Sequence, residues 1–166
     1  MPVIANQYNY ATPLSSAPNF GTERGSTQDK RYFTLSDNVL DGSYYPISGD
    51  VGLWSESISD SNGYLSEPFT ARVDGNVSIH AFTLLCSQYA YPVDFTVEFY
   101  NGTELVHGIT ANGNTLHEYT YYFNSVVDAT HYIITITRIS SANSSAKILN
   151  AYTPGYVKRA DNLSLG

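Results

Sequence analysis

The segment 93–100 constrains the fold most, because apolar and polar residues alternate along it: Val-Asp-Phe-Thr-Val-Glu-Phe-Tyr. A period of two places the four apolar side chains on one side, so the segment is predicted to be a β-strand with one buried face. Asn101-Gly102 follows directly. This dipeptide predicts a two-residue type I′ turn, with 103–109 returning as the antiparallel partner.

Further segments rich in β-branched and aromatic residues recur at roughly ten-residue spacing, as in all-β proteins. Asp74-Gly75-Asn76 is predicted to be a tight turn between two of them. No stretch shows a helical period. Seven or eight short strands predict an all-β antiparallel β-sandwich or jelly roll. Beside the hairpin, the expected strands are 32–35, 69–73, 77–85, 115–123, 131–139 and 146–152.

The 166-residue length fits one domain. Residues 1–30 are rich in Pro, Ser and Asn and have no sustained period, which predicts an extended or flexible N-terminal arm. A disordered leader is the alternative. The β-sandwich is expected over 31–156, and 157–166 is expected to be a C-terminal tail or linker.

Charge and hydropathy exclude several partner classes. The net charge is −7, and no basic cluster exceeds a pair such as Lys158-Arg159, which argues against nucleic acid as a partner. No run of eighteen apolar residues exists, so no membrane insertion is expected. The first twenty residues lack the basic and apolar regions of a signal peptide, so Sec-type export is not predicted.

Catalytic signatures are missing from the sequence. The single Cys86 allows neither a disulfide nor a CxxC pair and is expected to be a buried apolar residue. The carboxylates are dispersed, so the expectation is a protein that is not an enzyme. One alternative stays open at this point, a zinc or acid–base site in which His80 and His107 converge with Asp94 or Glu98.

Aromatic residues are the more promising ligand candidates. Neutral sugars are commonly held by flat rings together with a few directional hydrogen-bonding groups. Aromatic side chains in predicted loops fit this chemistry, and two polar residues supplement them. The candidate ligand-binding residues are Tyr44, Tyr45, Trp54, Tyr89 and Tyr91, with Arg72 and Asn143 as the polar members.

Two stretches also carry a resemblance to known families. Asn38-Val39-Leu40-Asp41-Gly42, followed by Gly52-Leu53-Trp54-Ser55, resembles the Asn-x-x-Asp-Gly … Trp-Ser opening of discoidin domains. The likeness extends over about 31–156. The stretch 91–102 is also similar to β-sandwich segments in tail and minor structural proteins of phages of Gram-positive bacteria.

The discoidin resemblance implies a galactose-binding-like jelly roll, a non-catalytic module that holds a sugar or a protein in loops at one end. In that family the matching Trp commonly packs in the core, an alternative to the ligand role of Trp54. Many members hold a structural Ca²⁺, and Asp41 is the residue here that matches a metal ligand. Leu53 stands where a Thr ligand is expected and Asn150 near the position of a Glu, so the oxygen set of such a site is incomplete.

The expected function is a non-enzymatic attachment module of a phage virion, in the tail or baseplate, that binds a glycan or a neighbouring virion protein. No cofactor is expected beyond the structural Ca²⁺ that the resemblance raises. A homo-oligomer is compatible with tail symmetry. The alternative is a carbohydrate-binding module of a larger, extracellular glycan-degrading enzyme. A third possibility is that this domain is itself a hydrolase.

Overall fold

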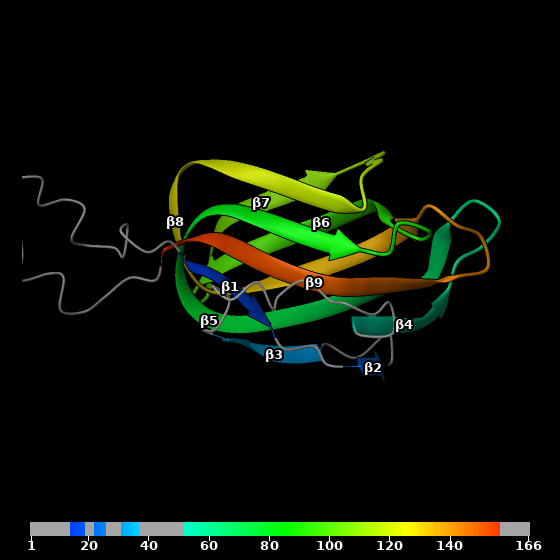
Figure 1. Ribbon diagram of the computed structural model, residues 1–166, viewed down its shortest axis with the longest axis horizontal. Coiled ribbons are helices and arrows are strands. Elements are labelled where there is room, and N and C mark those ends of the chain that lie inside the picture. Colours follow the sequence, from blue (N-terminus) through cyan, green and yellow to red (C-terminus); the bar gives the residue numbers. More distant parts are fainter. Residues whose placement is uncertain (1–13, 19–21, 26–30, 37–51, 157–166) are drawn as a thin grey trace, which may run out of the picture.

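The fold is an antiparallel β-sandwich, which confirms the predicted all-β class (Figure 1). A computed structural model describes residues 14–18, 22–25, 31–36 and 52–156. Every regular element among them is a strand: β1 (Leu14–Pro18), β2 (Thr22–Gly25), β3 (Arg31–Ser36), β4 (Gly52–Ile58), β5 (Tyr64–Cys86), β6 (Pro92–Asn101), β7 (Glu104–Ala111), β8 (Glu118–Ile139) and β9 (Ser145–Tyr156). The described residues include no helix that is long and apolar enough to cross a membrane.

Two long strands create the two layers. β5 and β8 pair antiparallel from Tyr64↔Arg138 to Leu85↔Glu118, and both bend midway (Figure 1). The first half of β5 and the second half of β8 join β6 and β7 in what we call the first layer. The other halves join β9 and β4 in the second layer. One folded ribbon therefore supplies strands to both sides of the core.

The bends of β5 and β8 lie where the sequence predicted a tight turn and two separate strands. Asp74-Gly75-Asn76 is not a tight turn, because β5 continues through it with shifts in register on either side of Val77–Ile79. The segments expected at 115–123 and 131–139 are likewise two halves of β8. Between the pairs Ala81↔Tyr122 and Ile79↔Val127, β8 carries residues 123–126 opposite the single residue His80. This excess length lets the strand change layers without a turn.

The β6–β7 hairpin is confirmed, although its turn lies one residue later than predicted. Asn101 pairs with Glu104, so Gly102 and Thr103 form the two-residue connection. Among these two only Gly102 has a positive φ, 64°. A type I′ turn needs positive φ at both central residues, whereas type II′ needs it only at the first. The turn is therefore not the predicted type I′.

The core lies between the layers and is built around aromatic rings. Phe82 in the second layer packs edge-on against Phe99 and Tyr132 in the first, with ring centroids 5.6 and 5.4 Å apart. Phe95 meets Tyr119 in the same way at 5.1 Å. Such pairs stabilise a core beyond the area they bury. Cys86 is buried as predicted, and burial raises the pKa of its thiol, so it packs as an apolar residue.

Strands at the N-terminal side complete the sheet. β1 pairs with β9 and β3, and the two parallel pairings, β2 with β4 and β3 with β5, are short. Two segments of the predicted 1–30 arm are thus strands that pair with the domain. The rest of that arm and the predicted tail 157–166 lie outside the described residues.

Candidate functional site

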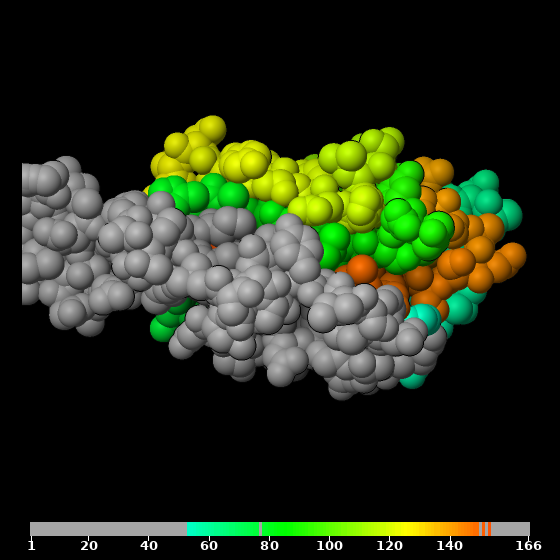
Figure 2. Space-filling view, in the orientation of Figure 1, coloured from blue at the N-terminus to red at the C-terminus, as the bar shows by residue number. Residues whose placement is uncertain are grey.

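Four loops gather at the end of the sandwich opposite the bends of β5 and β8: 59–63, 87–91, 112–117 and 140–144. Figure 2 shows the first of these (teal) and the last (orange) side by side at that end. The Ser59 hydroxyl donates to the Ser141 carbonyl at 2.6 Å, and the backbone amide of Asn143 donates to the Ser59 carbonyl at 3.0 Å. The Tyr91 amide donates to the Ser140 hydroxyl at 3.1 Å. These bonds fix the loops relative to one another.

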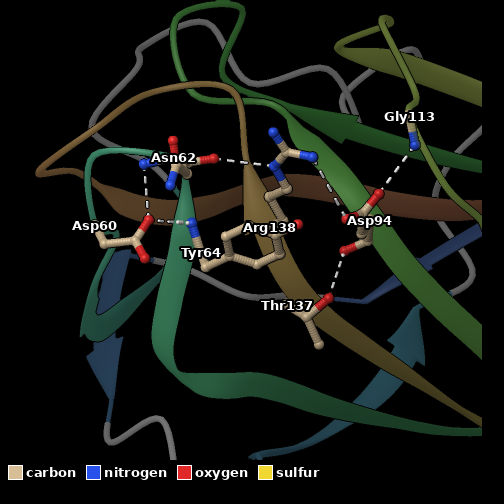
Figure 3. Close-up of polar contacts among 7 residues, drawn as sticks. All are labelled: Asp60, Asn62, Tyr64, Asp94, Gly113, Thr137 and Arg138. Atoms are coloured by element: carbon tan, nitrogen blue, oxygen red, sulfur yellow. Dashed lines mark hydrogen bonds and ion pairs between the residues drawn. The ribbon is translucent and has the colours of Figure 1, made fainter.

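An arginine on the first layer adds a second set of restraints at this end (Figure 3). Arg138 lies over the Tyr64 ring at 4.8 Å, and its Nε donates to the Asn62 carbonyl at 3.0 Å. Its guanidinium also reaches the Asp94 carboxylate at 4.0 Å. Asp94 in turn accepts the Gly113 amide at 2.9 Å. Arg138 therefore links loops 59–63 and 112–117 through β8 and β6.

A pocket of about 250 Å³ opens between these loops and β4 and β9. Its apolar wall consists of the Trp54 indole and Ala90. The Lys147 ammonium lies 4.0 Å from the centroid of the Trp54 ring, because the two residues are direct cross-strand partners on β9 and β4. The full lining is Trp54, Ser87, Ala90, Ser144, Ser145 and Lys147, so hydroxyl groups supply most of its polar side chains.

Four of the predicted ligand residues lie at this end. Trp54 lines the pocket, although it belongs to strand β4 and not to the loop in which the sequence analysis placed it. It is half-buried, so it is not a residue of the closed core. Tyr89 and Tyr91 flank the pocket residue Ala90, and Tyr89 is 77% exposed. Asn143, with φ of 52°, precedes the pocket residue Ser144.

The second polar candidate, Arg72, does not join this group. Arg72 lies on the outer face of β5 and forms an ion pair with Asp74, with Nε 2.9 Å from Oδ1. Tyr44, Tyr45 and the expected metal ligand Asp41 lie outside the described residues. Lys147 and the serines were missed, because nothing in their local sequence shows that β9 pairs with β4.

The described residues do not form the cluster that the zinc alternative requires. His107 faces the second layer, where its Nε2 is 3.1 Å from the Tyr121 hydroxyl. Asp94 and Glu98 lie on the opposite, outer face of β6. Within the described ranges, no three His, Cys, Asp or Glu side chains come together to hold a metal ion.

Comparisons with known proteins identify solved structures of similar fold. The chain is similar to a selenomethionine-labelled variant of chitosan-binding module 1 from the chitosanase/glucanase of Paenibacillus sp. IK-5, with a TM-score of 0.52 and 12% identity over 90% of this chain and 97% of that one. The unlabelled module gives a TM-score of 0.50 at 11% identity, covering 85% and 94%. The family 32 CBM from C. perfringens NanJ in complex with galactose gives 0.35 at 20% identity, covering 46% and 59%.

No family model matches the sequence, and no curated protein matches it. The two chitosan-binding module structures share the β-sandwich fold of this chain.

Proposed function

We propose that this protein is a non-catalytic attachment module that binds a glycan in the pocket between Trp54 and Lys147. The carrying observation is the composition of that pocket: an indole and a methyl group beside three serines and an ammonium group. A sugar ring has an apolar C–H face and a rim of hydroxyls. The indole and Ala90 suit the face, and the serine hydroxyls suit the rim, since each can donate and accept a hydrogen bond.

Rigidity of the site supports the proposal. The loops that carry Ala90 and Ser144 are held by the hydrogen bonds of Ser59 and Ser140, and Lys147 restrains the Trp54 ring. A preformed site loses less conformational entropy on binding than a mobile one. The chitosan-binding module also supports the proposal, as a protein of this fold whose ligand is a carbohydrate.

We propose that the module belongs to the tail or baseplate of a phage virion, where it can form a homo-oligomer. Its support is the resemblance of 91–102 to phage structural proteins. The second setting is a carbohydrate-binding module of a larger glycan-degrading enzyme, which the likeness to a module of a chitosanase/glucanase favours. Tail genes beside the coding sequence would support the first setting, and a fused or adjacent hydrolase would support the second.

Glycan binding is tested on an array of bacterial wall sugars and host glycans. The wild-type protein is expected to bind a defined subset, and Trp54→Ala is expected to weaken binding by about tenfold or more, the loss of roughly 1.4 kcal/mol or more. Tyr122→Ala is the matched control, since this ring is 77% exposed and lies outside the pocket. Circular dichroism verifies that each variant is folded. A folded wild type that binds no glycan, or a Trp54→Ala variant that binds like wild type, would refute the proposal.

A further inference from the structure

The outer face of the first layer carries a row of four threonines, one from each of four adjacent strands. Thr70 on β5 lies opposite Thr135 on β8, Thr135 lies opposite Thr96 on β6, and Thr96 lies opposite Thr110 on β7. Their sequence neighbours are buried, so all four side chains point away from the core. Adjacent strands are spaced by about 4.8 Å, which sets the repeat of the hydroxyls across the sheet.

Longer, charged side chains border this row on both sides. On one side, Arg72 and Glu98 lie two positions along β5 and β6 from Thr70 and Thr96. On the other side, Asp94 lies two positions from Thr96, and its pairing partner Arg138 lies three positions from Thr135, past a shift in register (Figure 3). Arg72 is ion-paired with Asp74 at 2.9 Å, and Arg138 approaches Asp94 at 4.0 Å. These two pairs offset the charges of both arginines, and Glu98 adds one negative charge. The face offers many hydrogen-bonding groups without a strong field of either sign.

At Gly108, beside this row, no side chain covers the backbone. It lies in the middle of β7, directly opposite Glu98, and nothing is within 4 Å of the place where a Cβ would be. Packing within the chain therefore does not require a glycine here, although glycine weakens a strand interior. Glycine inside a strand marks either a β-bulge or a place where a ligand approaches the backbone closely. Here a bulge lies nearby at Val106, between the pairs Phe99↔His107 and Tyr100↔Leu105, and the exposed Gly108 backbone is also open to a ligand.

We propose that this face binds an extended, uncharged β-linked polysaccharide that lies across the strands, at a site separate from the Trp54 pocket. In such a polymer each sugar ring advances by nearly the spacing of adjacent strands, so successive rings meet successive threonines. Each Thr hydroxyl donates to or accepts from a sugar hydroxyl. The guanidinium and carboxylate groups at the borders suit vicinal hydroxyl pairs, to which they form charge-assisted hydrogen bonds. Locally paired charges favour a neutral polymer over an ionic one.

Native affinity electrophoresis in gels containing hydroxyethylcellulose or glycol chitin, two neutral β-1,4-linked polymers, tests the proposal. The key variant is Thr96→Val/Thr135→Val, which removes two hydroxyls and retains β-branched side chains of the same shape. Its binding is expected to be about tenfold weaker, since each neutral hydrogen bond accounts for roughly a factor of three. Thr115→Val, in the exposed loop 112–117, is the matched control.

Trp54→Ala separates this site from the pocket. Retardation of wild type, Thr115→Val and Trp54→Ala by at least one polymer, with its loss in the double threonine variant, would support the proposal. Three results would overturn it: no retardation of wild type by either polymer, equal retardation of the double variant and wild type, or loss confined to Trp54→Ala. Because the effect of Trp54→Ala on array binding reports on the pocket, and that of the double threonine variant on gel retardation reports on this face, either site can fail while the other stands.

Discussion

At the scale of single residues, Tyr132 is a polar exception within the core. Its side chain is 1% exposed, and in the described part of the chain its hydroxyl is the only buried side-chain polar atom without a hydrogen-bond partner. An unsatisfied buried hydroxyl costs about 1–3 kcal/mol. Tyr132→Phe is therefore expected to raise the free energy of unfolding in urea by about 1 kcal/mol. Tyr121→Phe, which loses its contact with His107, is expected to lower it, and a destabilised Tyr132→Phe would contradict the argument.

His131 couples stability to pH. Its ring stacks on Tyr100, with centroids 5.1 Å apart, and burial, followed by the charge of Arg72, lowers its pKa below 6.5, with Asp74 acting in the opposite direction. The unfolded state therefore takes up this proton first as the pH falls, so the contribution of His131 is fully present above 6.5 and is lost as the pH falls through the lower folded-state pKa.

The comparison of His131→Phe with wild type tests this coupling, because the variant keeps a stacking ring. Thermal unfolding at pH 7.5 and pH 5 is expected to show a larger loss of Tm for wild type than for His131→Phe. His117→Phe, which replaces an exposed loop histidine, is expected to behave as wild type. Equal losses of Tm in wild type and His131→Phe would show that this histidine has no part in the pH dependence.

At the scale of elements, the β4–β5 loop depends on Gly63. This residue has φ of 90°, and a Cβ there would lie 2.1 Å from the Ile139 carbonyl oxygen. Gly63→Ala is thus expected to cost about 3 kcal/mol or more in the free energy of unfolding. Gly113→Ala is the control, because φ is 75° there but nothing lies within 4 Å of the added methyl. It is expected to cost about 1 kcal/mol, and similar losses in both variants would show that the close approach to Ile139 is unimportant.

The same elements show what a local pattern can specify. β6 follows the predicted alternation from Phe95 to Phe99, because each side chain meets either core or solvent in a regular pleat. The bends of β5 and β8 were not predictable, since residues such as 74–76 permit either a turn or a bend. Only pairing with a distant strand selects the bend, as the excess residues 123–126 of β8 show.

At the scale of the whole molecule, the pocket shows the same dependence on long-range pairing. Trp54 and Lys147 become neighbours because β4 pairs with β9, and Ala90 joins them because loops 87–91 and 140–144 are hydrogen-bonded to each other. The sequence predicted ligand-binding roles for four residues near this pocket from their residue types and their expected positions in loops: Trp54, Tyr89, Tyr91 and Asn143. It could not show that Arg72 lies apart from them, because that follows only from the path of β5 through both layers.

The folded ribbon of β5 and β8 also predicts how the molecule unfolds. Phe82 is fully buried and contacts Phe99 and Tyr132 of the opposite layer, so its truncation leaves a cavity between the layers. Phe82→Ala is expected to lower the free energy of unfolding by about 3–5 kcal/mol. Because β5 and β8 belong to both layers, near-UV and far-UV circular dichroism are expected to report one coincident transition. Tyr122→Ala, at an exposed position on β8, is expected to change stability by less than about 1 kcal/mol. Separate transitions for the two signals would mean that the layers unfold independently despite their shared strands.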